Sequence, residues 1–186
     1  EVLMEKKTPR RHGNCAMNEE AEQSIRERVC WLLKGGGAHE SFDSMVHAIP
    51  AEKRGVRAAG TPYTPWRLLE HMRMAQHDIL EYVRDPEYTS PPHPAGFWPD
   101  EEAPPDDDAW RRSVEQFRTD NEALRMLVTS PDSELTGELA HTAAGHTILR
   151  AALLAGDHNA YHLGELAVVR RLIGAFPVDN EAPDNI

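Results

Sequence analysis

The chain has 186 residues, of which 40% are hydrophobic, and this is enough to bury one sizeable core. Its 31 acidic residues against 20 basic ones give a formal net charge of -11, which disfavours binding to nucleic acid or to an anionic membrane surface. Two cysteines cannot build a disulfide framework, and no apolar run reaches the length of a signal peptide core or a membrane span. We therefore expect a cytoplasmic protein with one domain and no nucleic-acid or membrane partner.

The N-terminal part of the chain is predicted to hold an extension and then a helix. Residues 1–17 show no apolar periodicity, so we expect a flexible extension there. A helix is predicted to begin after Asn18 as its N-cap, to break at "GGG" (35–37), and to resume as "HESFDSMVHAI" until Pro50.

Three further helices follow from apolar stripes and from the residues that flank them. The second is predicted from Pro62 or Pro65 to Arg84. The third begins at "DDDAW" (106–110) and ends at "SPD" (130–132). The fourth runs from about Thr147 to Ile173, and Gly174 closes it. The pattern predicts an all-α domain over residues 18–176, a four-helix bundle with a C-terminal tail at 177–186.

A proline-rich connection, residues 85–105, separates the second and third helices. It can span about 70 Å, whereas the second helix is about 30 Å long, so the connection can return along the bundle and leave these two helices parallel. Two interpretations of it stay open. It can carry functional groups, or it can be a stiff strap that covers the side of the bundle.

The stretch "GDHNAYHLGEL" (156–166) places His158 and His162 one helical turn apart. With 10 histidines in the chain, random placement yields roughly half a pair at this spacing, so the pair alone is weak evidence. Both histidines, however, fall in the middle of the apolar stripe, which Glu165 shares. Buried imidazoles need hydrogen-bond partners or a metal ion.

The second helix supplies a third imidazole on its inward face, His71, and a carboxylate that borders the same face, Asp78. If the second and fourth helices are antiparallel, the three histidines lie at similar depth. Three imidazoles could then hold one divalent ion at about 2.0 to 2.1 Å and leave a position open for water or substrate. We expect Glu165 or Asp78 to accept a hydrogen bond from a ligand imidazole or to move a proton. A buried histidine and carboxylate network without metal is the alternative.

The remaining histidines give weaker signals. His77 is predicted on the outer face of the second helix. His39 could point inward, and His146 could cap the fourth helix or approach the site.

The fourth helix has a second apolar stripe on its back, opposite His158. Since a bundle helix needs only one buried face, this stripe predicts a homodimer. Coverage by residues 85–105 or by the segment after "GGG" is the alternative. The stripe consists of Leu149, Leu153, Ala160, Leu163 and Ala167.

Three stretches of the chain resemble the DinB-like proteins: "TPWRLLEHMRMAQHDILEYVRDPEY", "FWPDEEAPPDDDAW" and "GHTILRAALLAGDHNAYHLGELAVVRRLIG". The resemblance covers about residues 20–175. It implies an up-down-down-up four-helix bundle, often dimeric, with a divalent ion such as zinc or nickel held by three histidines. The matching positions are His71, His158 and His162. His146 departs from the pattern, because glutamine is expected there.

The resemblance also implies a class of activity. Similar proteins include metal-dependent transferases that use small thiols such as bacillithiol or mycothiol, and an isomerase of the maleylpyruvate type. We therefore expect a metal-dependent enzyme of the thiol S-transferase or hydrolase type that acts on a small molecule. The alternatives are a non-catalytic metal-binding or stress-response dimer and a structural dimer without metal, because one fold hosts many functions.

Overall fold

The computed structural model describes residues 19–143 and 145–176, and this part of the chain is helical. It contains five α-helices and two short 3-10 helices, with no named strand among the described residues. The predicted all-α class is therefore confirmed. The predicted extension at 1–17, the N-cap Asn18 and the tail at 177–186 lie outside the described residues.

The first predicted helix is interrupted where the glycines occur. Helix α1 spans Glu19–Lys34, and α2 spans Phe42–Val46. Gly35 and Gly36 have φ angles of 68° and 77°, in the left-handed region that glycine adopts without steric cost. The glycines therefore end α1 and let the chain restart as the short α2.

The three long helices begin at hydrogen-bonded N-caps. Helix α3 (Pro65–Arg84) is capped by Thr64, α4 (Asp107–Thr129) by Asp106, and α5 (Ile148–Leu172) by Thr147. Each capping side chain accepts a hydrogen bond from a backbone N–H three residues later, which satisfies one of the free donors of the first turn. These starts agree with the predicted ones to within a residue or two.

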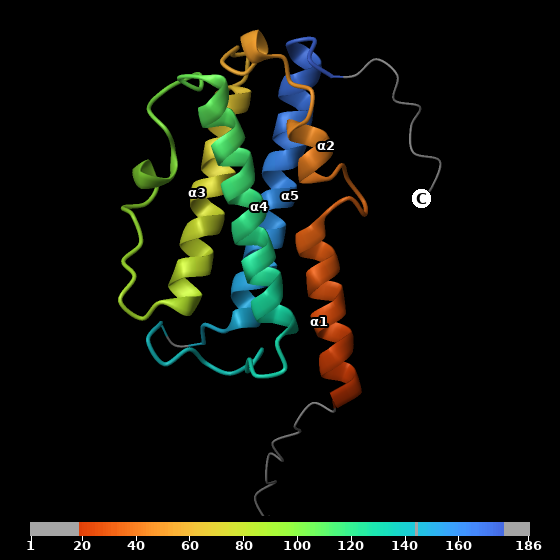
Figure 1. The fold of residues 1–186 in the computed structure, drawn as a ribbon, viewed down its shortest axis with the longest axis vertical. Coiled ribbons are helices and arrows are strands. Elements are labelled where there is room, and N and C mark those ends of the chain that lie inside the picture. The colour runs from red at the N-terminus through yellow and green to blue at the C-terminus, as the bar shows by residue number, and fades with distance from the viewer. Residues whose placement is uncertain (1–18, 144, 177–186) are drawn as a thin grey trace, which may run out of the picture.

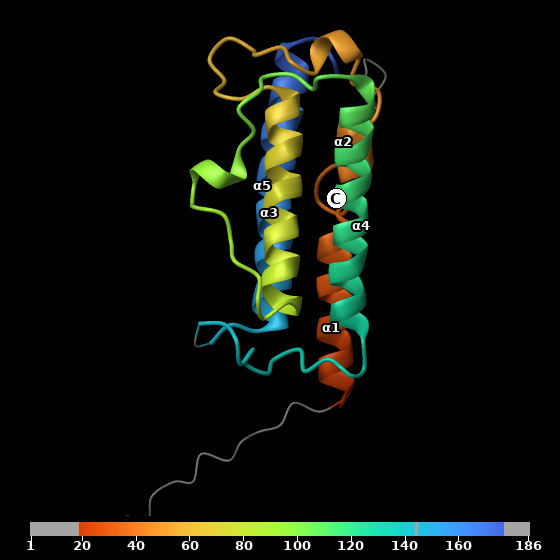
Figure 2. The same ribbon diagram turned by 60° about the vertical axis from the view of Figure 1, so that its left-hand side comes forward.

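The long connection lies beside α3. Figure 1 shows residues 85–106 leaving the lower end of α3 and returning to the upper end, where α4 begins; Figure 2 shows the same segment alongside α3 from a second direction. The 3-10 helix η2 (Ala95–Phe97) lies within it and contacts α3. The connection thus passes over the side of α3, close to the middle of that helix.

The core consists of two apolar clusters with a polar layer between them. One cluster joins α2 to the first half of α3, the first half of α4 and the second half of α5. The other joins α1 to the remaining halves of α3, α4 and α5. Between them lie buried Gln76, Asn159, His71 and His162, contributed by α3 and α5. The histidines therefore lie near the middle of the packed helices, between the two clusters.

The second apolar stripe of α5 is largely covered by the chain itself. Leu163 is buried in the cluster that contains α2, and Leu149 packs against the cluster that contains α1. Leu32 of α1 lies so close to Gly156 that a Cβ there would be 2.7 Å from its carbons. Of the predicted stripe, Leu153 is exposed, at 45%. The stripe is therefore covered partly by α1, which precedes "GGG", and partly by α2, which follows it.

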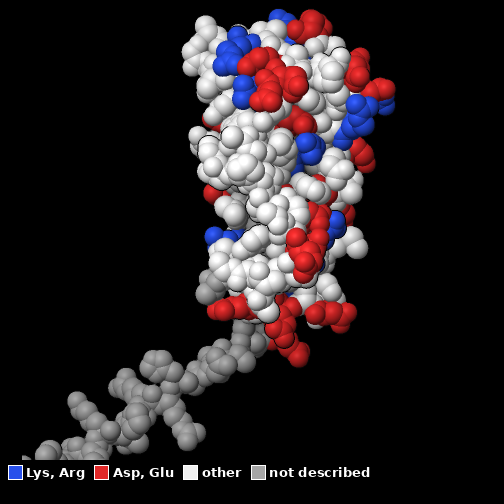
Figure 3. Space-filling model, turned by 90° about the vertical axis from the view of Figure 1, so that its left-hand side faces the viewer, with Lys and Arg blue, Asp and Glu red and all other residues white. Residues whose placement is uncertain are grey.

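The surface over α3 and the long connection is unevenly charged. Figure 3 shows charged side chains of both signs near the upper end of this face and acidic ones at its lower end. The area between them carries few charges on the left of the view and a group of charged side chains on the right. Among residues 19–143 and 145–176, no helix combines the length and the hydropathy needed to cross a membrane.

Candidate metal centre

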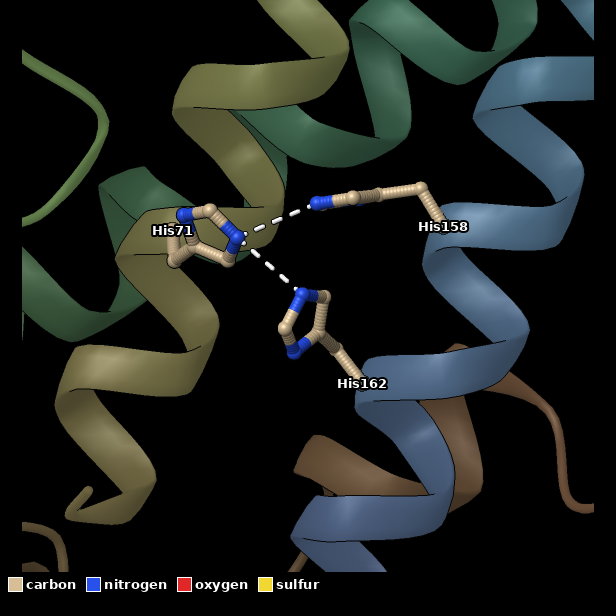
Figure 4. Close-up of side chains that lie close together, drawn as sticks. All are labelled: His71, His158 and His162. Carbon is tan, nitrogen blue, oxygen red and sulfur yellow. Dashed lines mark hydrogen bonds between the residues drawn. The ribbon is translucent and has the colours of Figure 1, made fainter. Parts of the chain in front are cut away.

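Three imidazoles converge between α3 and α5. His71 Nε2 lies 3.0 Å from His158 Nε2 and 3.1 Å from His162 Nε2. Figure 4 shows the three rings pointing toward one another from the two helices. One ligand nitrogen from each residue lies within 4.8 Å of the other two, which is close enough to hold a metal ion. No other group of three or more His, Cys, Asp or Glu among the described residues is arranged in this way.

The helices explain the convergence. His158 and His162 are one turn apart on α5, so their rings project from the same face. That face packs against α3, where His71 lies between the two apolar clusters. His71 and His162 are 9% and 7% exposed, and His158 is half-buried. Predicting each helix face from its periodicity was therefore sufficient to identify the three residues.

Two of the imidazoles are fixed from behind by acceptors. His71 Nδ1 lies 2.8 Å from the Phe97 carbonyl oxygen, and His162 Nδ1 lies 2.6 Å from Glu165 Oε2. A carbonyl or a carboxylate accepts a hydrogen bond, so in both rings Nδ1 is the protonated nitrogen. The Nε2 atoms of His71 and His162 are then left with lone pairs that face the centre.

With these tautomers, neither His71 Nε2 nor His162 Nε2 carries a proton where the two atoms approach each other. Two lone pairs at 3.1 Å repel each other, whereas a cation between them attracts both. Tetrahedral coordination at about 2.0 to 2.1 Å would place ligand nitrogens about 3.3 Å apart, close to the observed spacing. The donor set therefore fits a divalent ion, with three protein ligands.

The imidazoles are held neutral at physiological pH. Burial lowers the pKa of His158 to about 4, with a further contribution from the neighbouring imidazoles. Burial also lowers the pKa of His162 to about 4, and it lowers the pKa of His71. A neutral imidazole is the form that binds a metal, and the Nε2 atoms of His71 and His162 carry no proton at pH 7.

The long connection forms one wall of the site. Trp98 stacks on His71 with ring centroids 3.8 Å apart and an interplanar angle of 1°, and Tyr63 stacks on Trp98 with centroids 4.1 Å apart. Together with the Phe97 carbonyl, these rings fix the orientation of His71. The sequence predicted Asp78 or Glu165 for such contacts and did not predict Phe97 or Trp98. The available signal was the pair of aromatic residues in a proline-rich segment.

The two predicted carboxylates have different surroundings. Glu165 contacts His162, its side chain is 31% exposed, and burial raises the pKa of its carboxyl group. Asp78 makes no hydrogen bond to any of the three imidazoles in the described structure. It lines a cavity to which none of the three imidazoles contributes.

The weaker histidine candidates lie away from the centre. His146 Nδ1 lies 2.8 Å from the Tyr82 hydroxyl, in the cavity that contains Asp78. His39 Nδ1 lies 2.7 Å from the backbone oxygen of Glu40. His77 is not simply on the outer face, because its Nδ1 lies 3.0 Å from Asp120 Oδ2 of α4. The packing of α4 against α3 decides this contact, which the periodicity of α3 alone does not show.

Replacing Glu165 with alanine should weaken metal affinity by about tenfold or more, because the Nδ1 hydrogen bond orients His162 and increases its basicity. Competition with a chromophoric chelator at pH 7 measures this change. Asp78→Asn is the matched control and should leave the affinity unchanged. Equal affinities for wild type and Glu165→Ala would contradict the role of the carboxylate.

The metal-free protein should lose stability on acidification. Because the pKa of His162 is about 4 in the folded state and near 6.5 when unfolded, the unfolded chain binds more protons between these values. The stabilisation is therefore complete above pH 6.5 and is lost as the pH falls toward 4. Between pH 6.5 and pH 5 this residue should contribute a loss of about 2 kcal/mol. Urea unfolding in the presence of a chelator measures the change, and His162→Gln should show a shallower pH dependence; parallel profiles would refute the assignment.

Comparison of the chain with protein-family models, with curated proteins and with solved structures gives no match. The assignment of a function therefore depends on the residues and the geometry of this chain.

Proposed function

We propose that this chain is a DinB-like metal-dependent enzyme that acts on a small molecule, of the thiol S-transferase or hydrolase type. The observation that carries the proposal is the contact between His71 Nε2 and His162 Nε2, 3.1 Å apart with both outer nitrogens bound to acceptors. A cation bound between the two nitrogens would relieve the repulsion between their lone pairs. We take α1, α3, α4 and α5 as the four helices of an up-down-down-up bundle, with residues 85–106 as its crossover; the course of the chain in Figure 1 supports this interpretation.

Within this proposal, each residue of the site has a specific role. His71, His158 and His162 would hold one divalent ion, with zinc or nickel as the expected metals. Such an ion with an open position lowers the pKa of a bound thiol or water and so supplies a nucleophile near neutral pH. Glu165 holds the proton on His162 Nδ1, and the Phe97 carbonyl holds the one on His71 Nδ1. Trp98 covers one side of His71 and limits the access of water there.

Metal analysis of the untagged protein, followed by thiol-consumption assays, tests the proposal. We expect about one zinc or nickel ion per chain, and metal-dependent loss of a small thiol in the presence of an electrophile from a panel of alkyl halides, epoxides and activated alkenes. A His158→Ala protein serves as the inactive control. Bound metal with no turnover of any thiol or hydrolysable substrate would overturn the proposal of catalysis. It would instead favour a non-catalytic metal-binding or stress-response protein of the same fold.

We also propose that the protein is a homodimer through the exposed face of α5. Leu154, Tyr161 and Val168 are 45%, 65% and 52% exposed, and they follow one another at intervals of seven residues. In a two-fold antiparallel helix pair centred near Tyr161, Leu154 of one copy would meet Val168 of the other. We assign the dimer interface to this face because α1 and α2 cover the stripe on the back of α5.

Light scattering at micromolar concentration should give a mass near twice 20.9 kDa. Tyr161→Glu should reduce it to one chain without loss of helicity, because it places a charge in the apolar interface. Met126→Glu changes an equally exposed apolar residue on α4 and should leave the mass unchanged. A monomeric wild-type protein over this concentration range would refute the dimer.

A further inference from the structure

A cavity lies between α3, α5 and the segment that joins α4 to α5. Its volume is about 250 Å³. Apolar side chains from each of these elements line it, including Ile79, Leu139 and Leu154. Leu154 precedes His158 by one turn of α5, a distance of about 6 Å along the helix axis. A ligand in the cavity is therefore near enough to extend toward the three imidazoles.

The carboxylate of Asp78 in this cavity is incompletely satisfied. Its Oδ1 atom is buried and has no hydrogen-bond partner among the described residues. Burial, together with the charge of the nearby Asp78 carboxylate, raises the pKa of the Tyr88 phenol to about 12. The Oδ1 atom of Asp78 is therefore available to a donor group of a ligand. A buried acceptor without a partner costs free energy that an N–H group of a ligand can recover.

A positive charge lies in the same cavity without a partner. The Arg150 side chain lines the cavity and is exposed, and no ion pair or side-chain hydrogen bond is formed by its guanidinium within the described part of the chain. It does not pair with Asp78. Nearby, the Tyr82 hydroxyl and His146 Nδ1 are 2.8 Å apart, which gives this wall a fixed polar surface. The cavity therefore offers an acceptor for a cation and a donor for an anion, together with apolar side chains.

We propose that this cavity binds the amino and carboxylate groups of a small α-amino acid or amino-acid conjugate, with the ammonium group on Asp78 and the carboxylate on Arg150. The side chain of the ligand would lie along Leu154 and point toward His158. The volume is slightly below the range of drug-sized pockets and suits a ligand of amino-acid size. The inference rests on the proposed function for the role of this ligand as substrate or co-substrate, whereas binding itself does not require metal.

Calorimetric titration of the full chain with S-methyl-L-cysteine tests this inference. The probe has the amino acid groups but no thiol that could bind a metal, and the titration is carried out with metal-depleted and with zinc-loaded protein. We expect saturable binding in both. Two analogues lack one group each: 3-(methylthio)propanoate has no amine, and 2-(methylthio)ethylamine has no carboxylate. Each should bind about tenfold more weakly or worse, because each loses one charge-assisted hydrogen bond.

Variants of Asp78 and Arg150 identify which group of the ligand each residue binds. Asp78→Asn should weaken the binding of S-methyl-L-cysteine and of the amine by about tenfold and leave that of 3-(methylthio)propanoate unchanged. Arg150→Gln should have the converse effect. Arg28→Gln on α1 and Asp132→Asn, at an exposed position just after α4 that does not line the cavity, are the matched controls and should change nothing.

Each outcome separates the inference from the proposed function. No saturable binding of S-methyl-L-cysteine, or binding that neither Asp78→Asn nor Arg150→Gln weakens, would overturn the inference, and thiol turnover would still support the proposed function. Binding that depends on both residues would support the inference even if no metal-dependent reaction is found.

Discussion

Replacing His158 with alanine is expected to reduce metal affinity by more than about 100-fold. The substitution removes one of three imidazole ligands, and losing even a residue that orients a ligand costs about 10- to 100-fold. The two remaining imidazoles, His71 and His162, leave an ion with two protein contacts, fewer than the three that an open zinc site uses. Competition with a chromophoric chelator at pH 7, together with metal analysis of the purified variant, measures the loss.

His77→Ala is the control for the substitution of a histidine as such. His77 lies on α3, as His71 does, but it contacts Asp120 of α4 instead of the other imidazoles. Its removal should leave metal affinity within about twofold of wild type, because it contributes no ligand or ligand contact. If His158→Ala retained wild-type affinity while the helical content was unchanged, the three imidazoles would not be the metal site.

Replacing Gln76 with alanine is expected to destabilise the protein by about 2 to 4 kcal/mol. The side chain is fully buried and joins three helices. Its amide donates to the Phe117 carbonyl of α4 at 2.7 Å and accepts from Asn121 of α4 and from Asn159 of α5. Alanine would leave these partners unpaired between the packed helices and would also leave a cavity.

Urea unfolding followed by circular dichroism measures this change, and Gln116→Ala provides the comparison. Gln116 is exposed on α4, and its amide bonds to Asp120. Its removal should change the free energy of unfolding by less than about 0.5 kcal/mol. Because Asn159 follows His158 directly, Gln76→Ala should also weaken metal binding. Equal stability of the two variants would show that the polar layer does not fix the helices.

The helix boundaries could be predicted because their signals are local. Thr147 before α5 and Asp106 before α4 are capping residues, and the left-handed glycines after α1 are a stop that needs no tertiary contact. Each of these residues acts on the backbone within three or four positions. The starts and ends of the long helices therefore followed from the sequence to within a residue or two.

The metal-ligand candidates could be predicted for a related reason. The periodicity of α5 places His158 and His162 on its apolar face, and that of α3 does the same for His71. Glu165 reaches His162 within one turn of the same helix, so local geometry is sufficient for that contact as well. Asp78 borders the same face as His71 but lies two turns away. Periodicity alone does not show whether its carboxylate reaches an imidazole that binds the metal.

The sequence by itself therefore determined the helices, their apolar faces and the three histidines that share them. Only the tertiary structure decided what covers each face. It placed Phe97 and Trp98 over His71, packed α1 and α2 against the back of α5, and left a cavity between Asp78 and Arg150. The physical reason is that a repeat of 3.6 residues fixes the direction of side chains around one helix axis. The neighbour that meets them is selected by the packing of elements distant in sequence, and an aperiodic connection such as residues 85–106 takes its path from those contacts.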